Sequence, residues 1–275
     1  MPSKSSRRNL SEACNSLRIV CESPANLATL KDAVAQLEEL TDPMPIVVLK
    51  GIPKLKGDID EIAGSFVTLR LANANKRDER AIDSFAIREF ERRVIEGSSR
   101  ARGVPYEGVG LMKLYHRLLL GSSSSVIVTD RLVMTWSDDD LRYHARVAVF
   151  GFPSVISMSG LVEAPARPKE YYLAKQAIDP KGRGISEASL AEEFSGRFLE
   201  SDDERTPTVL KGYLLQCLFY ANTLEPFCKK KDCMLYNAHW QEEMLHAQVE
   251  SGKLCRKHAV ILKKIILEGS NPVLF

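Results

Sequence analysis

The stretch from Cys228 to His258 constrains this chain more than any other. It contains three of the six cysteines and three of the five histidines. Four residues separate Cys228 from Cys233, and two residues separate Cys255 from His258. A structural zinc ion takes four nitrogen or sulfur ligands, commonly as two such pairs at the ends of a loop. The spacing therefore predicts a structural Zn2+ site with these four residues as its ligands.

An alternative interpretation is that the cysteines are free thiols in a reducing cytosol and that His258 is a surface residue. Two pairs at ligand spacing coincide less readily than one, which favours the metal site. Basic side chains beside the ligands would also offset the negative charge of a thiolate-rich site. These are Lys229, Lys230, Lys231, Arg256 and Lys257. We expect a short helix, roughly Asn237 to Val249, between the two pairs.

Composition places the chain among soluble globular proteins, because 44% of its 275 residues are hydrophobic. The formal net charge is only +2, so no overall field favours nucleic acid or an anionic membrane. No stretch approaches the ~20 consecutive apolar residues of a membrane span, and the N-terminal residues lack the apolar run of a secretory signal. We therefore expect a cytoplasmic protein.

The hydrophobic pattern alternates between strands and helices. Four apolar segments are expected to be strands: Leu17–Val20, a buried Ile46–Leu49, Ser65–Leu71 and Val126–Thr129. Two further strands should flank the turn-like sequence at residues 151–153. This alternation predicts an α/β fold in which helices pack on a sheet.

Helical spacing of apolar residues begins at Leu27 and continues to Leu40, with Ser23 or Asn26 available as the cap. A charged helix with one buried stripe is expected from Asp78 to Glu96. Further helices are expected at Gly108–Leu120 and, in a strongly apolar segment, at Val209–Tyr220. The pattern predicts an N-terminal extension at residues 1–22, disordered over about residues 1–8, followed by one α/β domain at 23–275 with a looser division near residue 100.

From Cys228 onward the sequence resembles the archaemetzincins, zinc peptidases of the metzincin clan. Their motif HExxHxxGxxHC continues with x4-C-x-M, a long spacer and CxxC. Here CKKKDC and CRKH, the latter starting at Cys255, are similar to the cysteine half of that motif, with His258 in place of the last cysteine. The segments VIVTDRL and VAVFGFPSVISMSGL also resemble the family, so the likeness covers roughly residues 100–265.

A closer archaeal group described as metallopeptidases resembles this chain in the phrases HARVAVFGFP, GLVEAP and NAHWQEE. The resemblance implies a metzincin-like α/β fold, with a mixed sheet and packed helices. It also implies a C-terminal subdomain stapled by zinc at residues 228–258.

The catalytic half of the motif is where the chain departs from the family. The three metal-binding histidine positions fall on Cys217, Ala221 and Phe227, the glutamate position on Leu218, and the turn glycine on Leu224. Metzincin chemistry needs three histidines around zinc with an open site, and a glutamate that takes a proton from the bound water. We therefore expect no catalytic residue in this segment and a core helix in its place.

Three functions follow from these observations. The first is a non-catalytic relative of the metallopeptidases that holds a structural zinc and acts as a binding or scaffold protein, with a protein or peptide partner and no membrane. The second is a metal-dependent hydrolase that uses His239, Glu243 (or Glu242) and His246, which share one face if they lie on a helix. The third is a zinc-loop nucleic-acid binder that uses the lysines and arginine near the ligands, including Lys253, although the balanced net charge disfavours it.

Overall fold

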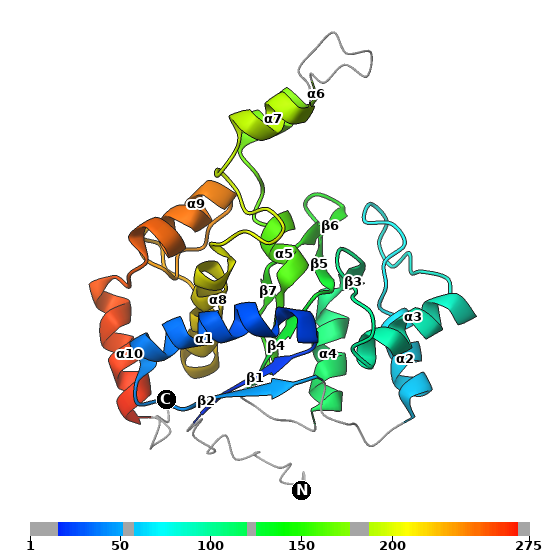
Figure 1. Cartoon of the computed structure of the whole chain (residues 1–275), viewed down its shortest axis with the longest axis horizontal. Coiled ribbons are helices and arrows are strands. Elements are labelled where there is room, and N and C mark those ends of the chain that lie inside the picture. The colour runs from blue at the N-terminus through cyan, green and yellow to red at the C-terminus, as the bar shows by residue number, and fades with distance from the viewer. Residues whose placement is uncertain (1–15, 52–57, 120–124, 177–186, 269–275) are drawn as a thin grey trace, which may run out of the picture.

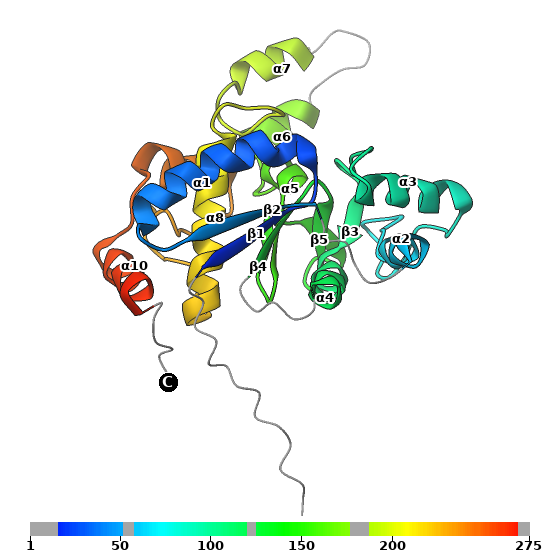
Figure 2. The same cartoon turned by 60° about the horizontal axis from the view of Figure 1, so that its bottom comes forward.

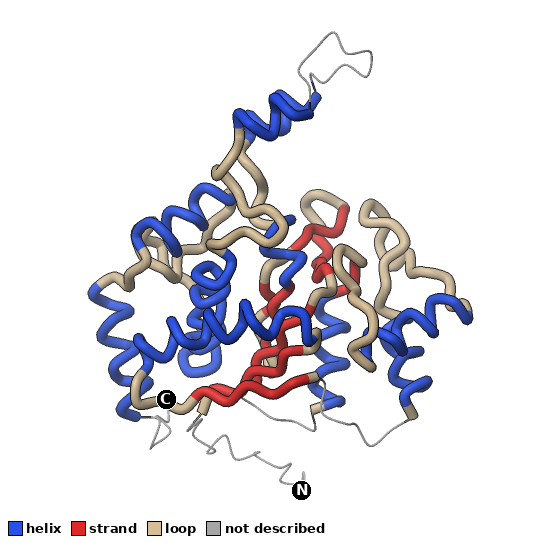
Figure 3. The backbone as a smooth tube through the Cα atoms, in the orientation of Figure 1, coloured by secondary structure: helices blue, strands red, loops and turns tan. Residues whose placement is uncertain are grey.

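The computed structural model describes residues 16–51, 58–119, 125–176 and 187–268 (Figure 1). The segment expected to be disordered, residues 1–8, lies outside these ranges. The described chain is a mixed α/β fold, with helices on both faces of a five-stranded sheet and a three-stranded sheet beside it. The predicted fold class, a mixed sheet with packed helices, is confirmed. Figure 3 shows the strands gathered at the centre and the helices around them.

The larger sheet runs in the order β2-β1-β4-β8-β7. Its strands are β1 (Leu17–Cys21), β2 (Ile46–Lys50), β4 (Ser125–Thr129), β7 (Ala148–Val149) and β8 (Ser154–Ser157). The first four in spatial order are parallel, whereas β7 pairs antiparallel with β8 and forms an edge. The sheet already begins at Leu17, so the ordered chain extends further toward the N-terminus than the expected domain start at residue 23.

Alternating side chains of the central strands divide the core into two halves. Leu17, Ile19 and Cys21 of β1 face helices α1 (Leu27–Thr41) and α8 (Thr206–Thr223), because these residues belong to one buried cluster. Val20 of β1 and Ile127 of β4 point to the opposite face. There they meet α2 (Ile59–Val67), α3 (Phe85–Ile95) and α4 (Gly108–Leu118). Figure 2 shows α1 and α4 on opposite sides of the sheet.

The smaller sheet has the order β3-β5-β6. It comprises β3 (Pro105–Glu107), β5 (Leu132–Ser137) and β6 (Arg142–Ala145). β3 is parallel to β5, and β5 forms an antiparallel hairpin with β6. This hairpin continues directly into the edge strand β7, so the two sheets meet along residues 145–148.

A buried arginine centre connects the α2–α3 helices to the sheet. Arg131, which is fully buried, forms ion pairs with Glu22 (3.1 Å) and Glu91 (2.6 Å). Its guanidinium lies between the rings of Phe66 (3.8 Å) and Tyr106 (4.6 Å). The Tyr106 hydroxyl donates a hydrogen bond to Glu91. One cation and two carboxylates, all inside the protein, therefore hold three distant segments together.

The strand expected at Ser65–Leu71 was wrong, because helix α2 occupies residues 59–67. Asp58 is its N-cap, and its side chain accepts a hydrogen bond from Asp60 N at 3.0 Å. Glu61 follows three residues after this cap, a spacing typical of helix starts. Only isolated bridges, at Arg70 and Leu71, remain of the expected strand.

One helix start, the burial of two segments and one helix cap also differ from the expectations. The helix expected from Asp78 begins only at Phe85, where Ser84 caps it, and Ile82 and Phe85 are 83% and 84% exposed rather than buried. β2 is only partly buried because it is an edge strand. Asn26 occupies the N-cap position of α1, but its side chain donates to Asp130 at 2.9 Å instead of capping the helix.

The chain after β8 is helical apart from its connections. Its elements are α5 (Met158–Glu163), α6 (Lys169–Gln176), α7 (Glu187–Glu193), α8, α9 (Gln241–Leu245), the π-helix η2 (His246–Ser251) and α10 (Arg256–Glu268). The helix expected at Asn237–Val249 thus starts later and changes its winding at His246. None of the helices in the described ranges combines the length and apolar character needed to cross a membrane.

Candidate metal centre

The first pair of candidate ligands lies in the loop that follows α8. Cys228 N donates a hydrogen bond to Leu235 O at 2.7 Å, and Cys233 N donates to Lys230 O at 3.0 Å. These two bonds fold the loop back on itself. Lys230 N also points at Cys228 Sγ, 3.4 Å away. Both sulfur atoms therefore sit on the same side of a tight loop that is held by its own backbone.

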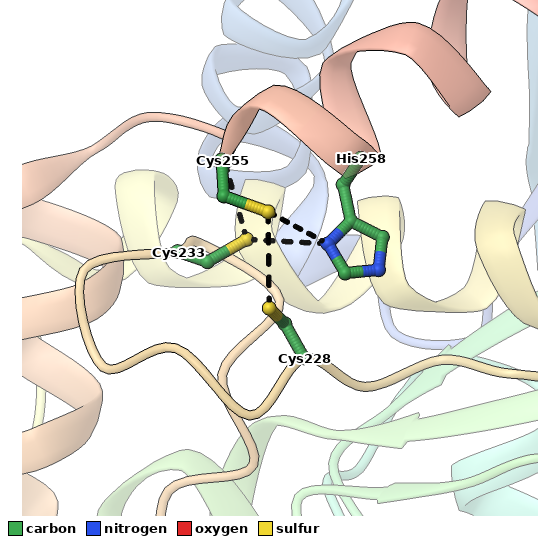
Figure 4. A group of neighbouring side chains, drawn as sticks. All are labelled: Cys228, Cys233, Cys255 and His258. Carbon is green, nitrogen blue, oxygen red and sulfur yellow. Dashed lines mark hydrogen bonds between the residues drawn. The ribbon is translucent and has the colours of Figure 1, made fainter.

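The second pair lies at the start of α10. Cys255 directly precedes this helix and His258 lies in its first turn, so two intervening residues place both side chains on one side. Met234 N donates to Lys253 O at 2.9 Å and joins the two segments beside the ligands. Figure 4 shows the four side chains pointing toward a common centre. We call Cys228, Cys233, Cys255 and His258 the cysteine–histidine cluster.

The spacing of the ligand atoms suits a tetrahedral ion. All four lie within 4.8 Å of one another. Cys228 Sγ lies 3.9 Å from Cys255 Sγ, Cys233 Sγ lies 3.7 Å from His258 Nδ1, and Cys255 Sγ lies 3.1 Å from the same nitrogen. A tetrahedron with zinc–sulfur bonds of about 2.3 Å has edges of about 3.8 Å. The sulfur–sulfur distance also excludes a disulfide, whose bond is about 2.05 Å.

The electrostatics of the cluster also suit a divalent cation. Burial and the neighbouring Cys228 raise the pKa of Cys233 to about 12. Burial alone would raise the pKa of Cys255, but N–H groups of His258 and Lys257 and the other two thiols hold it below its ordinary value. Burial lowers the pKa of His258, which keeps the imidazole neutral and its nitrogen free to bind metal. A zinc ion would deprotonate the coordinating thiols.

The cluster offers a closed coordination sphere. Cys233 is fully buried, and Cys228 and His258 are 7% and 5% exposed. The His258 ring also packs edge-on against Phe219 of α8, with ring centroids 5.6 Å apart. Four protein ligands complete a tetrahedral zinc site and leave no position for water or substrate. The cluster brings the start of α10 against the loop that follows α8.

The positions matched to the metzincin catalytic motif carry no metal site. Cys217 and Leu218 are buried in the core on α8, and burial raises the pKa of the Cys217 thiol to about 12. Ala221 cannot bind metal. Phe227 packs edge-on against Phe150, with centroids 5.3 Å apart. The segment is a helix of the core, as the sequence predicted.

The residues of the hydrolase alternative have separate partners. Glu243 accepts a hydrogen bond from His239 N at 3.0 Å and pairs with Lys231 at 3.4 Å. His246 contacts a carboxylate through each ring nitrogen, both at 2.8 Å, and these belong to Asp232 and Glu250. Glu242 pairs instead with an arginine, Arg197, at 2.6 Å. In the described ranges, the cysteine–histidine cluster is the one group of at least three such side chains close enough to hold a metal.

Exposed basic side chains lie along the two loops that carry the ligands. Lys229, Lys230, Lys231, Lys253, Arg256 and Lys257 are all exposed. Lys257 also contributes to the low pKa of His258. The structure thus places these residues where the sequence suggested, and their exposure is compatible both with offsetting thiolate charge and with binding an external anion.

A cleft that the sequence did not reveal lies beside the edge strand β7. Its volume is about 710 Å3. It is lined by residues 142–148 and Phe150 of the β6–β7 segment, by residues 163–166 after α5, and by residues of α8 and the loop after it. Gln216 of α8 lines it and is 1% exposed, yet its Oε1 has no hydrogen-bond partner among the described residues. Only the folded chain brings these segments together.

Comparison with known proteins now supplies the family. A model described as "Probable metallopeptidase family (DUF6775)" matches residues 20–265. The chain belongs to this family. A crystal structure of a zinc-dependent peptidase from Methanocorpusculum labreanum is 11% identical, with a TM-score of 0.38 over 90% of this chain and 100% of that one. At this distance the likeness says nothing about the chemistry of the present chain. No curated protein matches the sequence.

Proposed function

We propose that this protein is a zinc-stapled member of its metallopeptidase family that has lost metzincin-type catalysis and binds a protein or peptide partner. The observation that carries the proposal is the closed ligand set of the cysteine–histidine cluster. A catalytic zinc keeps one position open for water, whereas three thiolates and one imidazole fill all four. Zinc in this cluster would therefore stabilise the fold and would not activate water.

The character of α8 supports the loss of catalysis. The resemblance to archaemetzincins remains part of this proposal. In that family this helix would carry the first two histidines and the glutamate of the catalytic motif. Here the corresponding residues are Cys217, Leu218 and Ala221, and the first two are buried among apolar side chains. Cys217 has no second candidate ligand beside it, because the cysteine–histidine cluster is the one group of such side chains close enough to hold a metal in the described ranges.

The cleft beside β7 is the surface that we propose for the partner. It is concave, it contains both aromatic and polar side chains, and an edge strand borders it. Edge strands present unpaired backbone groups that can accept an extended segment. We further propose a cytoplasmic location, because Cys21, Cys217, Cys228, Cys233 and Cys255 are all free, which suits a reducing compartment.

The test is incubation of the zinc-loaded full chain with a mixture of unstructured peptides, followed by mass spectrometry with and without a chelator. We expect no chelator-sensitive cleavage. Cleavage that the chelator abolishes would overturn the proposal, and its loss in His239→Ala or His246→Ala but not in Cys217→Ala would favour the hydrolase alternative. Salt-sensitive binding of generic oligonucleotides, lost when residues 229–231 become glutamine, would favour the nucleic-acid alternative.

A further inference from the structure

One wall of the cleft carries a row of basic side chains. Arg142, His144 and Arg146 lie two residues apart along β6 and its continuation, and side chains at this spacing share one face of a strand. All three line the cleft. The intervening Tyr143 is buried against Trp136, with its ring centroid 5.1 Å from that of the tryptophan. Tyr143, which also borders the cleft, therefore anchors the strand that carries the row.

The two arginines of this row are available to an external ligand. Arg142 is exposed and forms no ion pair with the part of the chain that the structure describes. Arg146 is also exposed, and its Nε donates to Thr135 Oγ1 at 2.8 Å, which orients the guanidinium. Glu163 is the one acidic side chain among the described residues that line the cleft. The cleft thus has an excess of positive charge, although the whole chain is nearly neutral.

Another lining residue of the cleft supplies an acceptor that lacks a donor. Gln216 projects from the fully buried middle of α8, and its Oε1 has no partner among the described residues. A buried amide oxygen without a donor is costly, so a ligand N–H at this position would be favourable. A peptide backbone supplies such N–H groups at every residue except proline.

Aromatic rings also line the cleft. Phe150 lies with its centroid 5.3 Å from Phe227 and 5.6 Å from Tyr220. Phe150 and Phe227 line the cleft, together with Tyr213 and Tyr236 of neighbouring segments. Ala148 of the edge strand β7 also lines the cleft, so a bound ligand would lie beside the sheet edge.

We infer that the cleft binds an extended acidic peptide segment of a partner protein. Carboxylates of the peptide pair with Arg142 and Arg146, a backbone N–H donates to Gln216 Oε1, and an apolar side chain contacts Phe150 and Phe227. The inference rests on the proposed binding function and adds the chemistry of the partner. Arginine suits this role because its planar group binds carboxylates in a bidentate manner.

The test measures binding of fluorescent peptides to the zinc-loaded full chain by anisotropy. Three peptides of equal length share one aromatic residue and differ only in carrying Glu and Asp, Gln and Asn, or Lys. We expect the acidic peptide to bind about tenfold or more tightly than its amide counterpart, with a preference that weakens at high salt. The double variant Arg142→Gln/Arg146→Gln should lose this preference.

Two variants separate the cleft from general effects of charge and folding. Arg93→Gln removes an exposed arginine of α3, outside the lining of the cleft, and should keep the preference. Gln216→Leu should weaken binding of the acidic and amide peptides alike, by about tenfold, while zinc content stays unchanged and the melting temperature does not fall. Unchanged binding in Gln216→Leu would overturn the role given to this residue.

The remaining outcomes decide the inference as a whole. Equal binding of the acidic and amide peptides, or a preference that survives the double arginine substitution, would overturn it. A single-stranded oligonucleotide that displaces the acidic peptide and binds more tightly would also overturn it, in favour of a nucleic-acid ligand. Cleavage of a bound peptide would contradict the proposed loss of catalysis but would leave the acidic-peptide site standing.

Discussion

The cysteine–histidine cluster and the arginine centre both connect distant segments, but they balance their charge differently. In the arginine centre, Arg131 lies between Glu22 and Glu91, so cation and anions all belong to the chain. In the cluster, three thiols and one imidazole converge, and no cation of the chain lies among them. The arginine centre is therefore complete once the chain folds. In the proposal made above, the cluster is complete only when a metal ion joins it.

The largest loss of zinc content and stability is expected from Cys233→Ser. Structural zinc sites contribute apparent binding energies of about 10–16 kcal/mol in small zinc modules, and this energy is coupled to folding. We expect the variant to lose its zinc and to unfold locally from Cys228 through α10, which hydrogen exchange and metal analysis would detect. Cys21→Ser is the matched control, because it makes the same change at another buried cysteine, and its hydrogen bond to Ser23 O at 3.2 Å is one that serine can also make. Full zinc content in Cys233→Ser would rule out this ligand set.

The next largest loss of stability is expected from Arg131→Met. Removing one partner of a buried ion pair leaves uncompensated charges and costs about 3–5 kcal/mol of the free energy of unfolding. Denaturant unfolding should show this loss while zinc content stays at one equivalent, because the two centres are separate. Arg88→Met removes an exposed pair with Asp83 and should change stability little. Zinc loss in Arg131→Met would show that the two centres are coupled.

A smaller loss of stability is expected from substituting Asp130, which lies beside the arginine centre and is 2% exposed. Burial alone would raise its pKa, but hydrogen bonds from Arg100, Asn26 and Ser23 hold the pKa below its ordinary value. A carboxyl with a depressed folded pKa stabilises the protein above its unfolded pKa of about 3.9, and this contribution is lost as pH falls through the folded pKa. Asp130→Asn should therefore cost about 1–3 kcal/mol at neutral pH.

The pH dependence checks the cause of this cost. The difference in stability between the native protein and Asp130→Asn should shrink as pH falls below about 4. Denaturant unfolding of both proteins across this range would measure the difference, and acid release of metal affects both alike. A difference that does not change with pH would assign the cost to packing and not to charge.

The smallest changes in zinc content and stability are expected from His239→Ala and His246→Ala. His246 pairs with two exposed carboxylates, and these raise its pKa, but exposed pairs contribute little to stability. Zinc content and melting temperature should stay nearly unchanged in both variants. Titration of the native protein that shows a second ion, lost in both variants, would restore the hydrolase alternative.

The same contrast explains what the sequence could predict. The cluster's residues fall within one short stretch, and their spacing follows from zinc geometry, so the sequence indicated which side chains converge. The arginine centre joins residues that are 109 and 40 positions apart, and no local pattern marks them. The cleft was missed for the same reason, because Gln216, Arg142 and Arg146 come to line one cleft only through tertiary packing.

Local sequence patterns predicted secondary structure correctly where the signal for a helix or a strand was unambiguous. They failed where the same residues fitted both. The helices α1 and α4 follow clear helical periodicity, while β4 and α8 lie in strongly apolar segments. The run Ser65–Leu71 alternates like a strand, yet its first residues form the end of helix α2, whose N-cap is Asp58. Here the cap, with Glu61 three residues later, was the better signal. Packing of that helix against the arginine centre, through Phe66, outweighed strand propensity.

The most direct test of the closed, structural site is X-ray absorption at the zinc edge, combined with metal analysis, on protein purified without added metal. We predict one zinc per chain with three sulfur ligands at about 2.3 Å and one nitrogen at about 2.0–2.1 Å. Cys255→Ser should remove one sulfur or release the ion. A first shell that contains a water oxygen, or a second zinc bound by nitrogen and oxygen alone, would contradict the account and indicate an open, catalytic metal.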